Sequence, residues 1–318
     1  MVLPLCVVVL ALATRIPEAP RDSVASIDVV GAVLAVVALG GVTFALIEGA
    51  DGGWTSLEIA AGVLGLAAGC VALVYEPRVE HPMVPVDLFS IRPFTAANVI
   101  TFLVYGGMGV VFFLLPLQLQ VVAGWSPIEA GMALIPVTVT LLFLSSRAGD
   151  LAQRIGPRLP LTVGPLVMAA GTALLAMLGP DATFATVLPG VVVFGLGLAA
   201  AVAPVTSTAL GSVPDERAGA ASGTNNAIAR TGQLLAIAAV PGLAGLTGGA
   251  LADAAELDEG YPTAMLIGGA LVAAGGLAAA ILLRSTDARV EPAVRTPRSC
   301  PVDGAPLGVG AARHEQPD

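Results

Sequence analysis

Long, almost unbroken runs of apolar residues dominate this chain, and short segments rich in glycine, proline and charge separate them. Eight runs reach the length of about 20 residues at which an α-helix crosses a bilayer. They are residues 27–48, 57–75, 94–121, 127–146, 159–178, 184–210, 219–246 and 263–283. Strands of an outer-membrane barrel would instead show segments of about ten residues with alternating polarity. The pattern therefore predicts an all-α polytopic membrane protein with eight full transmembrane helices.

Composition agrees with a membrane protein. The 318 residues are 56% hydrophobic and 12% charged, with a mean hydropathy of +0.89, whereas soluble domains carry about 25% charged residues. The basic residues are all arginines, and all but Arg230 fall in alternate loops or in the C-terminal segment. The positive-inside rule places these loops in the cytoplasm. We therefore expect a multi-pass protein of the cell (plasma or inner) membrane with a cytoplasmic C-terminus, the lipid bilayer as partner, and no nucleic acid.

A shorter apolar segment, residues 1–13, precedes the eight runs. Its end, Ala11-Leu12-Ala13, has the small-x-small form of a signal-peptide cleavage site, but no basic segment precedes it. Cleavage would also leave Arg15 and Arg21 on the outer side. The segment is therefore interpreted as a partial transmembrane helix, with the signal peptide as the alternative.

The remaining sequence divides into three regions. Residues 14–93 contain two transmembrane helices and a proline-rich cytoplasmic linker. Residues 94–283 contain the other six spans. Residues 284–318 are rich in Pro, Arg and Gly without hydrophobic periodicity, which predicts a disordered cytoplasmic tail.

The third span carries polar and aromatic residues on one face. The spacing of three or four residues places them together on a helix. They are Asn98, Thr101, Tyr105, Met108 and Phe112. Two interpretations stay open: the polar members bond a neighbouring helix, as polar residues commonly do in membranes, or the face lines a cavity.

A second polar stripe lies in the seventh span, where Ser222, Asn226, Arg230 and Gln233 recur at helical spacing. An arginine at the centre of a membrane helix costs roughly 2.5–3.5 kcal/mol on insertion scales, so Arg230 should face protein or water. It either fixes the bundle through carbonyls or a carboxylate, or contacts a substrate.

The segment GDLAQRIGPR, Gly149 to Arg158, joins the fourth and fifth spans. Three arginines in and beside it, with Asp150 and two glycines, predict a short charged hinge on the cytoplasmic face. Its candidate functional residues are Gly149, Asp150, Arg154, Gly156 and Arg158.

The sequence contains few residues that could support catalysis or metal binding. Cys6, Cys70 and Cys300 are too scattered for a disulfide framework or a zinc site. His81 and His314 are the only histidines, and both lie outside the predicted spans. A Ser/His/Asp arrangement within the membrane is therefore excluded. We expect no enzyme, no catalytic residue, no metal and no cofactor.

The hinge resembles the cytoplasmic loop signature of the major facilitator superfamily, a glycine and an acid followed by basic residues around a second glycine. Other strings resemble its fourteen-span drug:proton antiporter branch. They are ALIEGADGGWTS, HPMVPVDLFSIRPFTAANVITFL, FFLLPLQLQVVAGWSPIEAGMALIP and VPDERAGAASGTNNAIARTGQLL. The match covers about residues 27–283. One departure is that the family's paired basic residues are reduced to Arg154 and Arg158.

The resemblance implies that residues 94–283 are the C-terminal six-helix bundle and that the two preceding helices are the extra pair of that branch. The family's first six helices, with its proton-linked acids, would then be absent except for the segment 1–13. Substrates in this superfamily bind between two six-helix bundles that rock about the site. This chain would supply one wall.

The resulting expectation is the C-terminal portion of a proton-coupled exporter of small amphipathic, drug-like compounds, not competent alone. Its proton gradient is implied only by the resemblance. The cavity wall would comprise Asn98, Thr101, Tyr105, Phe112, Asn226, Arg230 and Gln233, and the charged hinge would latch the cytoplasmic face. The alternatives are a membrane scaffold, a half-transporter that needs a separately encoded partner bundle, and an inert truncated gene product. The sequence does not identify the substrate.

Overall fold

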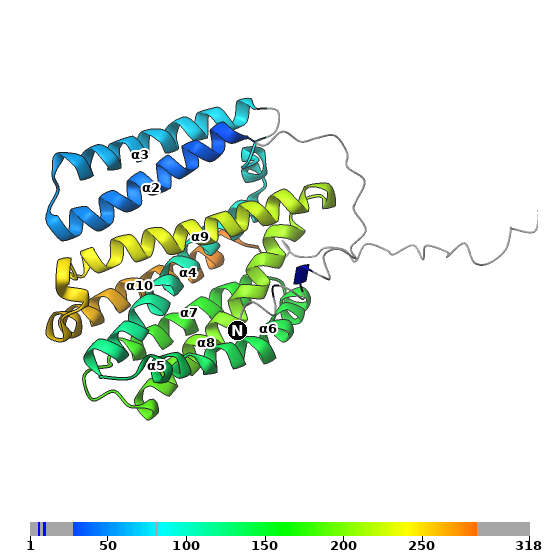
Figure 1. Ribbon diagram of the computed structural model, residues 1–318. Helices are drawn as coiled ribbons and strands as arrows, with labels where there is room; N and C mark the ends of the chain where they lie inside the picture. Colours follow the sequence, from blue (N-terminus) through cyan, green and yellow to red (C-terminus); the bar gives the residue numbers. More distant parts are fainter. Residues whose placement is uncertain (1–5, 7–8, 11–27, 80–81, 285–318) are drawn as a thin grey trace, which may run out of the picture. The chain divides into compact units, whose positions relative to one another are not determined.

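The computed structural model of the chain describes residues 28–79 and 82–284, together with Cys6, Val9 and Leu10 (Figure 1). Within that part of the chain the residues form helices, turns and loops, and no strand. The predicted all-α class is therefore confirmed for the described residues. The partial helix predicted at 1–13 and the tail predicted at 284–318 lie almost entirely outside them.

The helices follow one another along the chain with short connections. They are α2 (Val29–Gly52), α3 (Ser56–Tyr75), α4 (Arg92–Leu117), α5 (Pro127–Ala133), α6 (Ile135–Ile155), α7 (Arg158–Leu175), α8 (Phe184–Gly211), α9 (Ala218–Leu243) and α10 (Ala254–Leu282). Single turns extend or join them: η1 (Glu76–Arg78), η2 (Val86–Ser90), the π-helical turn η3 (Gln118–Val122), η4 (Asp215–Arg217) and η5 (Gly248–Leu251).

Among the described residues, seven helical segments are long and apolar enough to cross a membrane. They correspond to α2, α3 with η1, α4 with η3, α5 with α6, α7, α8 and α10. The predicted span at 219–246 is the exception. Its helix, α9, has 26 residues, and at 1.5 Å per residue it would reach across a bilayer. Its N-terminal half is too polar to qualify by hydropathy.

Helix α4 lies at the centre of the packing and contacts α8, α9 and α10, while α7 packs on α8 and α10 and α6 packs on α8. Small residues bring these helices close together. A Cβ added to Gly107 on α4 would clash with the backbone oxygen of Gly268 on α10 and with Val272. Glycine at this crossing allows the two backbones to touch.

Helices α2 and α3 form a hairpin whose own crossing is at Gly41 and Gly65. Helix α2 contacts α9, and Asp51 at its end accepts a hydrogen bond from the backbone N–H of Gly248 at 2.6 Å. Most of the hairpin's apolar side chains are exposed, for example Leu64 and Leu73. Most of the hairpin's apolar surface is therefore left uncovered by the rest of the described chain.

The connection between the fourth and fifth spans is shorter than predicted. Helix α6 continues to Ile155, so most of the expected hinge is helical. The break comes at Gly156, whose φ of 87° is the left-handed conformation that glycine adopts readily at a helix end. The error has a physical cause, because Asp150 and Arg154 mark a solvated helix end but do not stop a helix.

Local sequence explains where the fourth span begins and where it bends. Ser126 and Glu129 form a capping box at its start, with each side chain bonded to the other's backbone N–H. Pro136 lies two residues after Leu134, where α5 ends and α6 begins. Proline lacks the N–H that a continuous helix would use, which explains a break at this point.

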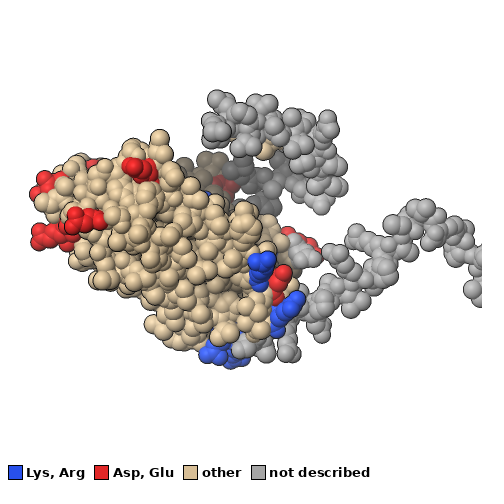
Figure 2. Space-filling model, turned by 90° about the horizontal axis from the view of Figure 1, so that it is seen from below, with Lys and Arg blue, Asp and Glu red and all other residues tan. Residues whose placement is uncertain are grey.

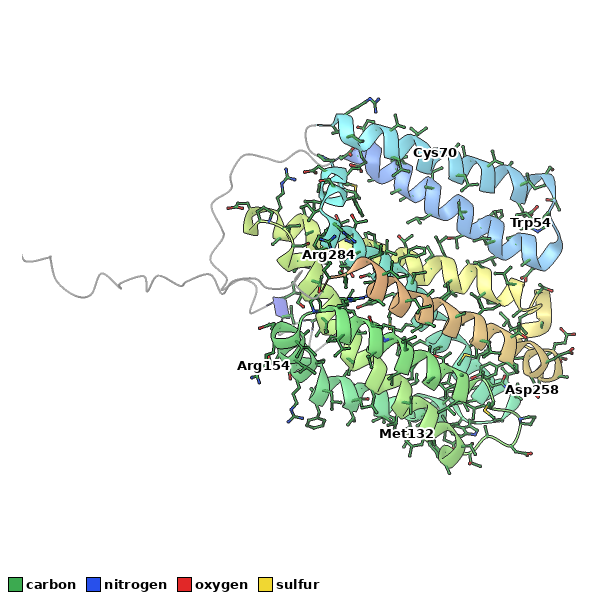
Figure 3. The ribbon with its side chains drawn as sticks, turned by 180° about the vertical axis from the view of Figure 1, so that it is seen from behind. Trp54, Cys70, Met132, Arg154, Asp258 and Arg284 are labelled. Atoms are coloured by element: carbon green, nitrogen blue, oxygen red, sulfur yellow. The ribbon has the colours of Figure 1, made fainter. Side chains whose placement is uncertain are left out.

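Charge is distributed unevenly along the helices. In the face shown in Figure 2, the arginines lie at one end of the helices, while a separate group of carboxylates lies at the other. Figure 3 places Arg154 and Arg284 at one end and Trp54 and Asp258 at the opposite end. The arginine asymmetry predicted from the loops is therefore present between the two ends of the described helices.

Candidate functional site

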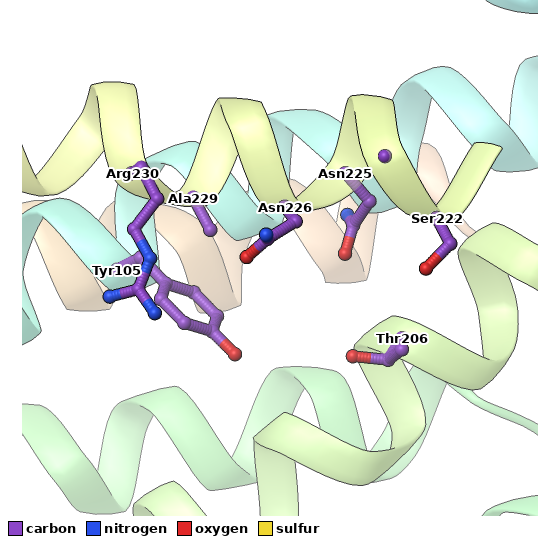
Figure 4. A pocket seen from close by; sticks show the side chains of 8 residues that line it. Tyr105, Thr206, Ser222, Asn225, Asn226, Ala229 and Arg230 are labelled. Carbon is purple, nitrogen blue, oxygen red and sulfur yellow. The ribbon is translucent and has the colours of Figure 1, made fainter. Parts of the chain in front are cut away.

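A polar pocket of about 340 Å³ opens between α4, α8 and α9. Pockets of this size accommodate small molecules. Figure 4 shows the α9 side chains facing across the opening toward α8, with Tyr105 of α4 beside them. The lining residues are Tyr105, Thr206, Ser222, Gly223, Asn225, Asn226, Ala229 and Arg230.

Helix α9 supplies most of this lining because its polar residues recur every four positions. Ser222, Asn226 and Arg230 are all exposed and all line the pocket. The next polar residue of the stripe, Gln233, is half-buried and does not line it. The helix therefore presents a polar stripe to open space rather than to packed apolar side chains.

Arg230 carries the pocket's only formal charge. Its Nη1 donates a hydrogen bond to Gln233 Oε1 at 3.1 Å, which leaves the rest of the guanidinium available. The ring of Tyr105 lies beside the guanidinium and points into the same space (Figure 4). Gln233 therefore orients Arg230 from outside the pocket.

Asn98 and Thr101 lie behind the pocket wall, with exposed fractions of 2% and 0%. Asn225 on α9 donates its side-chain amide to Asn98 Oδ1 at 3.1 Å and to Thr101 Oγ1 at 3.0 Å on α4. The amide of Asn98 in turn donates to the carbonyl of Phe94 at 2.9 Å. These residues form the interhelical hydrogen bonds that were one of the two interpretations of their face.

Phe112 also lies away from the pocket. Its ring meets Phe194 of α8 edge to face, with centroids 5.8 Å apart and an interplanar angle of 89°. The pair joins α4 to α8 within the apolar core. Of the seven predicted cavity residues, the pocket lining includes Tyr105, Asn226 and Arg230.

The pocket lining also includes five residues that were not predicted from the sequence: Thr206, Ser222, Gly223, Asn225 and Ala229. Ser222 could have been predicted, because it belongs to the polar stripe at helical spacing. Asn225 precedes Asn226, so a helix turns their side chains about 100° apart. Asn225 reaches both the pocket and α4, which spacing along one helix does not reveal. Thr206 comes from another helix.

The charged end of α6 contains the residues of the predicted latch. Asp150 and Arg154 are exposed, and within the described residues no ion pair joins them. Arg158 at the start of α7 donates from Nε and Nη2 to the carbonyl oxygen of Ala280, at 3.1 and 2.8 Å. This bidentate contact satisfies a carbonyl near the end of α10. Gly149 lies within α6, and Gly156 ends it.

The chemistry available in the pocket is limited to binding. Its lining holds hydroxyl, amide and guanidinium groups but no carboxylate, thiol or imidazole. The described residues contain no cluster of three or more His, Cys, Asp or Glu side chains that would hold a metal ion. The pocket therefore provides hydrogen bonds and one positive charge.

Comparison with known proteins identifies the family. Residues 5–237 match the model of the Major Facilitator Superfamily. The chain is 32% identical over 229 residues to the multidrug resistance protein Stp of Mycobacterium tuberculosis, which covers 70% of this chain and 42% of that protein. It is 27% identical to the multidrug efflux pump LfrA of Mycolicibacterium smegmatis, over 74% and 47% of the two chains. It is 29% identical to a methylenomycin A resistance protein of Streptomyces coelicolor, over 90% and 59%.

The matches thus span between about two fifths and three fifths of these relatives' own lengths. Their names describe resistance and efflux, and the family consists of membrane transporters rather than enzymes. Because the family match extends over more than half of its length, this chain belongs to the Major Facilitator Superfamily.

Proposed function

We propose that this chain is the C-terminal portion of a proton-coupled exporter of small amphipathic compounds, and that the pocket between α4, α8 and α9 is its wall of the substrate path. The observation that carries the proposal is the exposed polar stripe of α9, Ser222, Asn226 and Arg230. Polar side chains like these would be unfavourable in contact with the hydrocarbon of the bilayer.

The energetics of Arg230 support a water-filled or protein-covered path. A central arginine in lipid costs roughly 2.5–3.5 kcal/mol or more. Here Arg230 lies in the middle of α9, exposed within a polar pocket, and its Nη1 donates a hydrogen bond to Gln233. Water, or a second bundle across the pocket, would remove most of that cost. In this superfamily a second six-helix bundle faces the site.

The substrate class is inferred from the relatives and from the lining. Stp and LfrA are named for multidrug resistance and efflux, and a Streptomyces glaucescens relative is named for tetracenomycin C resistance and export. Hydroxyl and amide groups beside an aromatic ring suit varied amphipathic molecules. In this proposal Asn98, Thr101 and Phe112 hold the wall in shape, and Tyr105, Asn226 and Arg230 contact the substrate.

The proposed function implies how the helices and the C-terminus are placed in the membrane. The seven apolar segments and α9 would make eight spans, with the arginine-bearing end and the C-terminus in the cytoplasm. Residues 94–283 would form the C-terminal bundle, preceded by the extra helix pair. Asp150, Arg154 and Arg158 would latch the cytoplasmic face in one transport state. Proton coupling would depend on acids in the facing bundle.

Transport is tested in cells that lack their own drug pumps, by following loss of the fluorescent dye ethidium. The chain is expressed alone and together with the N-terminal six-helix bundle of a relative such as LfrA. We expect efflux only with the added bundle, and Arg230→Ala should abolish it at equal membrane abundance. Arg78→Ala, exposed in η1 and outside the pocket lining, is the matched control. No efflux in either form, or undiminished efflux by Arg230→Ala, overturns the proposal.

The pocket itself is tested by thiol labelling, which needs no transport. In a cysteine-free background, cysteines at Ser222 and Asn226 should react with a charged, water-soluble thiol reagent in membrane vesicles. A cysteine at Val63, exposed on the hairpin, should not react because lipid covers it. Labelling at Val63 alone would show that the polar stripe does not face water.

The same exposed stripe favours a second candidate, a half-transporter that binds a separately encoded bundle. Affinity purification of the chain from its native membrane should then recover a protein with six predicted spans. A chain that purifies alone and gives no efflux with any added bundle would instead be a scaffold or an inert product.

A further inference from the structure

A second cavity, of about 250 Å³, lies between α2, α4 and α9 and is mostly apolar. Helix α2 contributes Ile47 to its lining, α4 contributes Phe113, and α9 contributes Ile237 and Pro241. It shares no lining residue with the polar pocket. We call it the hairpin cavity, because the α2–α3 hairpin forms one of its walls. Its chemistry suits a different ligand from that of the polar pocket.

The hairpin cavity lies where α2 and α9 come into close contact. Gly242 on α9 approaches α2 so closely that an added Cβ would fall 2.7 Å from the Cβ of Ala50. Beside this contact, Asp51 Oδ1 accepts a hydrogen bond from the backbone N–H of Gly248 at 2.6 Å. Ala50, Asp51 and Gly242 all belong to the cavity lining. A ligand in the cavity would therefore touch both the hairpin and α9.

The apolar walls of the hairpin cavity are open to the surroundings of the protein. Ile47 is 43% exposed and Phe113 is 36% exposed. Both belong to helices that are long and apolar enough to cross a membrane. Around such helices the surroundings are the hydrocarbon of the bilayer, and apolar cavities do not hold water. The part of a ligand that fills this cavity is therefore hydrocarbon.

The only charged residue of the cavity lining, Asp51, marks the level of the lipid headgroups. It is the penultimate residue of α2 and stands three positions before Trp54, whose exposed ring lies against Gly49. Tryptophan is enriched at the boundary between membrane and water. Ile47 lies one helical turn back from Asp51. The cavity therefore places a carboxylate at the headgroups and apolar side chains deeper in the membrane.

The carboxylate of Asp51 is available to a positively charged group. Asp51 is exposed, and within the described part of the chain its Oδ2 has no hydrogen-bond donor and the carboxylate has no ion-pair partner. Figure 3 places Trp54 and Asp258 at this end of the helices, and Arg154 and Arg284 at the opposite end. An acidic end attracts cationic groups and repels anionic ones. Charge complementarity therefore favours a lipid with an ammonium headgroup over a lipid of net negative charge.

We propose that the hairpin cavity binds one phospholipid with an ammonium headgroup, of the phosphatidylethanolamine type, from the surrounding bilayer. Part of one acyl chain lies against Ile47, Phe113 and Ile237. The ammonium group donates a hydrogen bond to Asp51 Oδ2, while Oδ1 keeps its bond from Gly248. The lipid joins the hairpin to α9. The proposal rests on the cavity and on the membrane environment, and it holds whether or not the chain takes part in transport.

Lipid selectivity tests the role of Asp51. The full chain is purified in mild detergent, stripped of lipid and mixed with equal amounts of phosphatidylethanolamine and phosphatidylglycerol, and bound lipid is counted by native mass spectrometry. Wild type should retain one lipid and prefer phosphatidylethanolamine roughly three- to fivefold, the effect of one exposed charge pair. Asp51→Asn should bind both lipids equally, since its amide oxygen still accepts from Gly248. Glu48→Gln, an exposed carboxyl on α2 outside the lining, should keep the preference.

Filling the cavity tests its position. Ile237→Trp should abolish lipid retention, and Ile47→Trp on the opposite wall should do the same if the first variant fails to fold. Leu64→Trp, exposed on the hairpin and outside the lining, should retain the lipid. Cooperative thermal unfolding confirms that each variant is folded. No retained lipid in wild type, equal binding of the two lipids by wild type, or a preference that persists in Asp51→Asn overturns the proposal. So does tetraphenylphosphonium binding without any lipid, which would assign the cavity to an apolar cation.

Discussion

Asn225 of α9 donates a hydrogen bond to Asn98 of α4, with Nδ2 and Oδ1 3.1 Å apart, and the same amide reaches Thr101 Oγ1 at 3.0 Å. All three side chains are buried. Asn225 also lines the polar pocket. One side chain therefore fixes the distance between two helices and forms part of the surface that a ligand would contact.

Loss of this amide should weaken the α4–α9 contact. Asn225→Ala removes both interhelical hydrogen bonds and leaves Asn98 Oδ1 without this donor. Interhelical hydrogen bonds in membranes are worth about 0.6 kcal/mol on average and up to about 1.7 kcal/mol, so we expect a loss of about 1–2 kcal/mol. Unfolding in detergent with added denaturant measures it. The exposed neighbour Asn226→Ala should change stability by less than about 0.5 kcal/mol.

A double-mutant cycle separates the hydrogen bond from general packing. Asn98→Ala and Asn225→Ala are compared with the variant that carries both changes. The coupling energy should be at least about 0.5 kcal/mol if the two amides interact. Additive losses would show that the contact contributes nothing measurable.

Close packing of α4 on α10 gives a second prediction. A Cβ at Gly107 meets the backbone oxygen of Gly268 and the side chain of Val272, and the backbone oxygen cannot rotate away. Gly107→Ala should therefore destabilise the protein by about 1–3 kcal/mol. Gly40→Ala is the matched control, since nothing lies within 4 Å of its added Cβ. It should leave stability unchanged or raise it by up to about 1 kcal/mol through helix propensity. Equal effects of the two changes would contradict this account.

The sequence predicts the helices of this protein well, because membrane-spanning runs need only length and hydropathy. The helix start at Ser126 and the break near Pro136 also have local causes in the sequence. Helix α9 shows that hydropathy alone does not identify every helix long enough to span a membrane. Four of the polar residues that lower its hydropathy, Ser222, Asn225, Asn226 and Arg230, line the pocket. The polarity that forms the pocket is therefore part of what hides this helix from a hydropathy search.

The spacing of residues along a helix does not by itself show which of them line the pocket. Asn98 and Tyr105 share one face of α4, but Asn225 covers Asn98 while Tyr105 stays at the pocket. Periodicity gives the direction of a side chain and does not reveal which helix covers it. Asn225 shows the converse, because its role depends on a contact between residues 127 positions apart.

A surface ion pair should contribute little to stability. Arg217, before α9, pairs with Asp87 in the linker before α4, and the two side chains are 52% and 59% exposed. Exposed pairs are worth about 0–1 kcal/mol because water screens them and two long side chains lose freedom. A double-mutant cycle of Arg217→Ala and Asp87→Ala should give a coupling energy of at most about 1 kcal/mol, falling with added salt. A larger, salt-independent value would show a buried contact.

Arg158 distinguishes a structural contact from a charge latch. Its guanidinium donates two hydrogen bonds to the carbonyl of Ala280. Arg158→Ala should therefore lower the stability of the contact between α7 and α10 by about 0.5–1.5 kcal/mol. Arg158→Lys keeps the charge but lacks the planar fork that makes both contacts, so it should restore only part of the loss. Arg154→Ala, exposed on α6, should leave stability within about 0.5 kcal/mol of wild type. Amide exchange of residues near Leu282 measures the local effect. Full rescue by lysine would show that charge, and not the bidentate contact with Ala280, holds this end of the bundle.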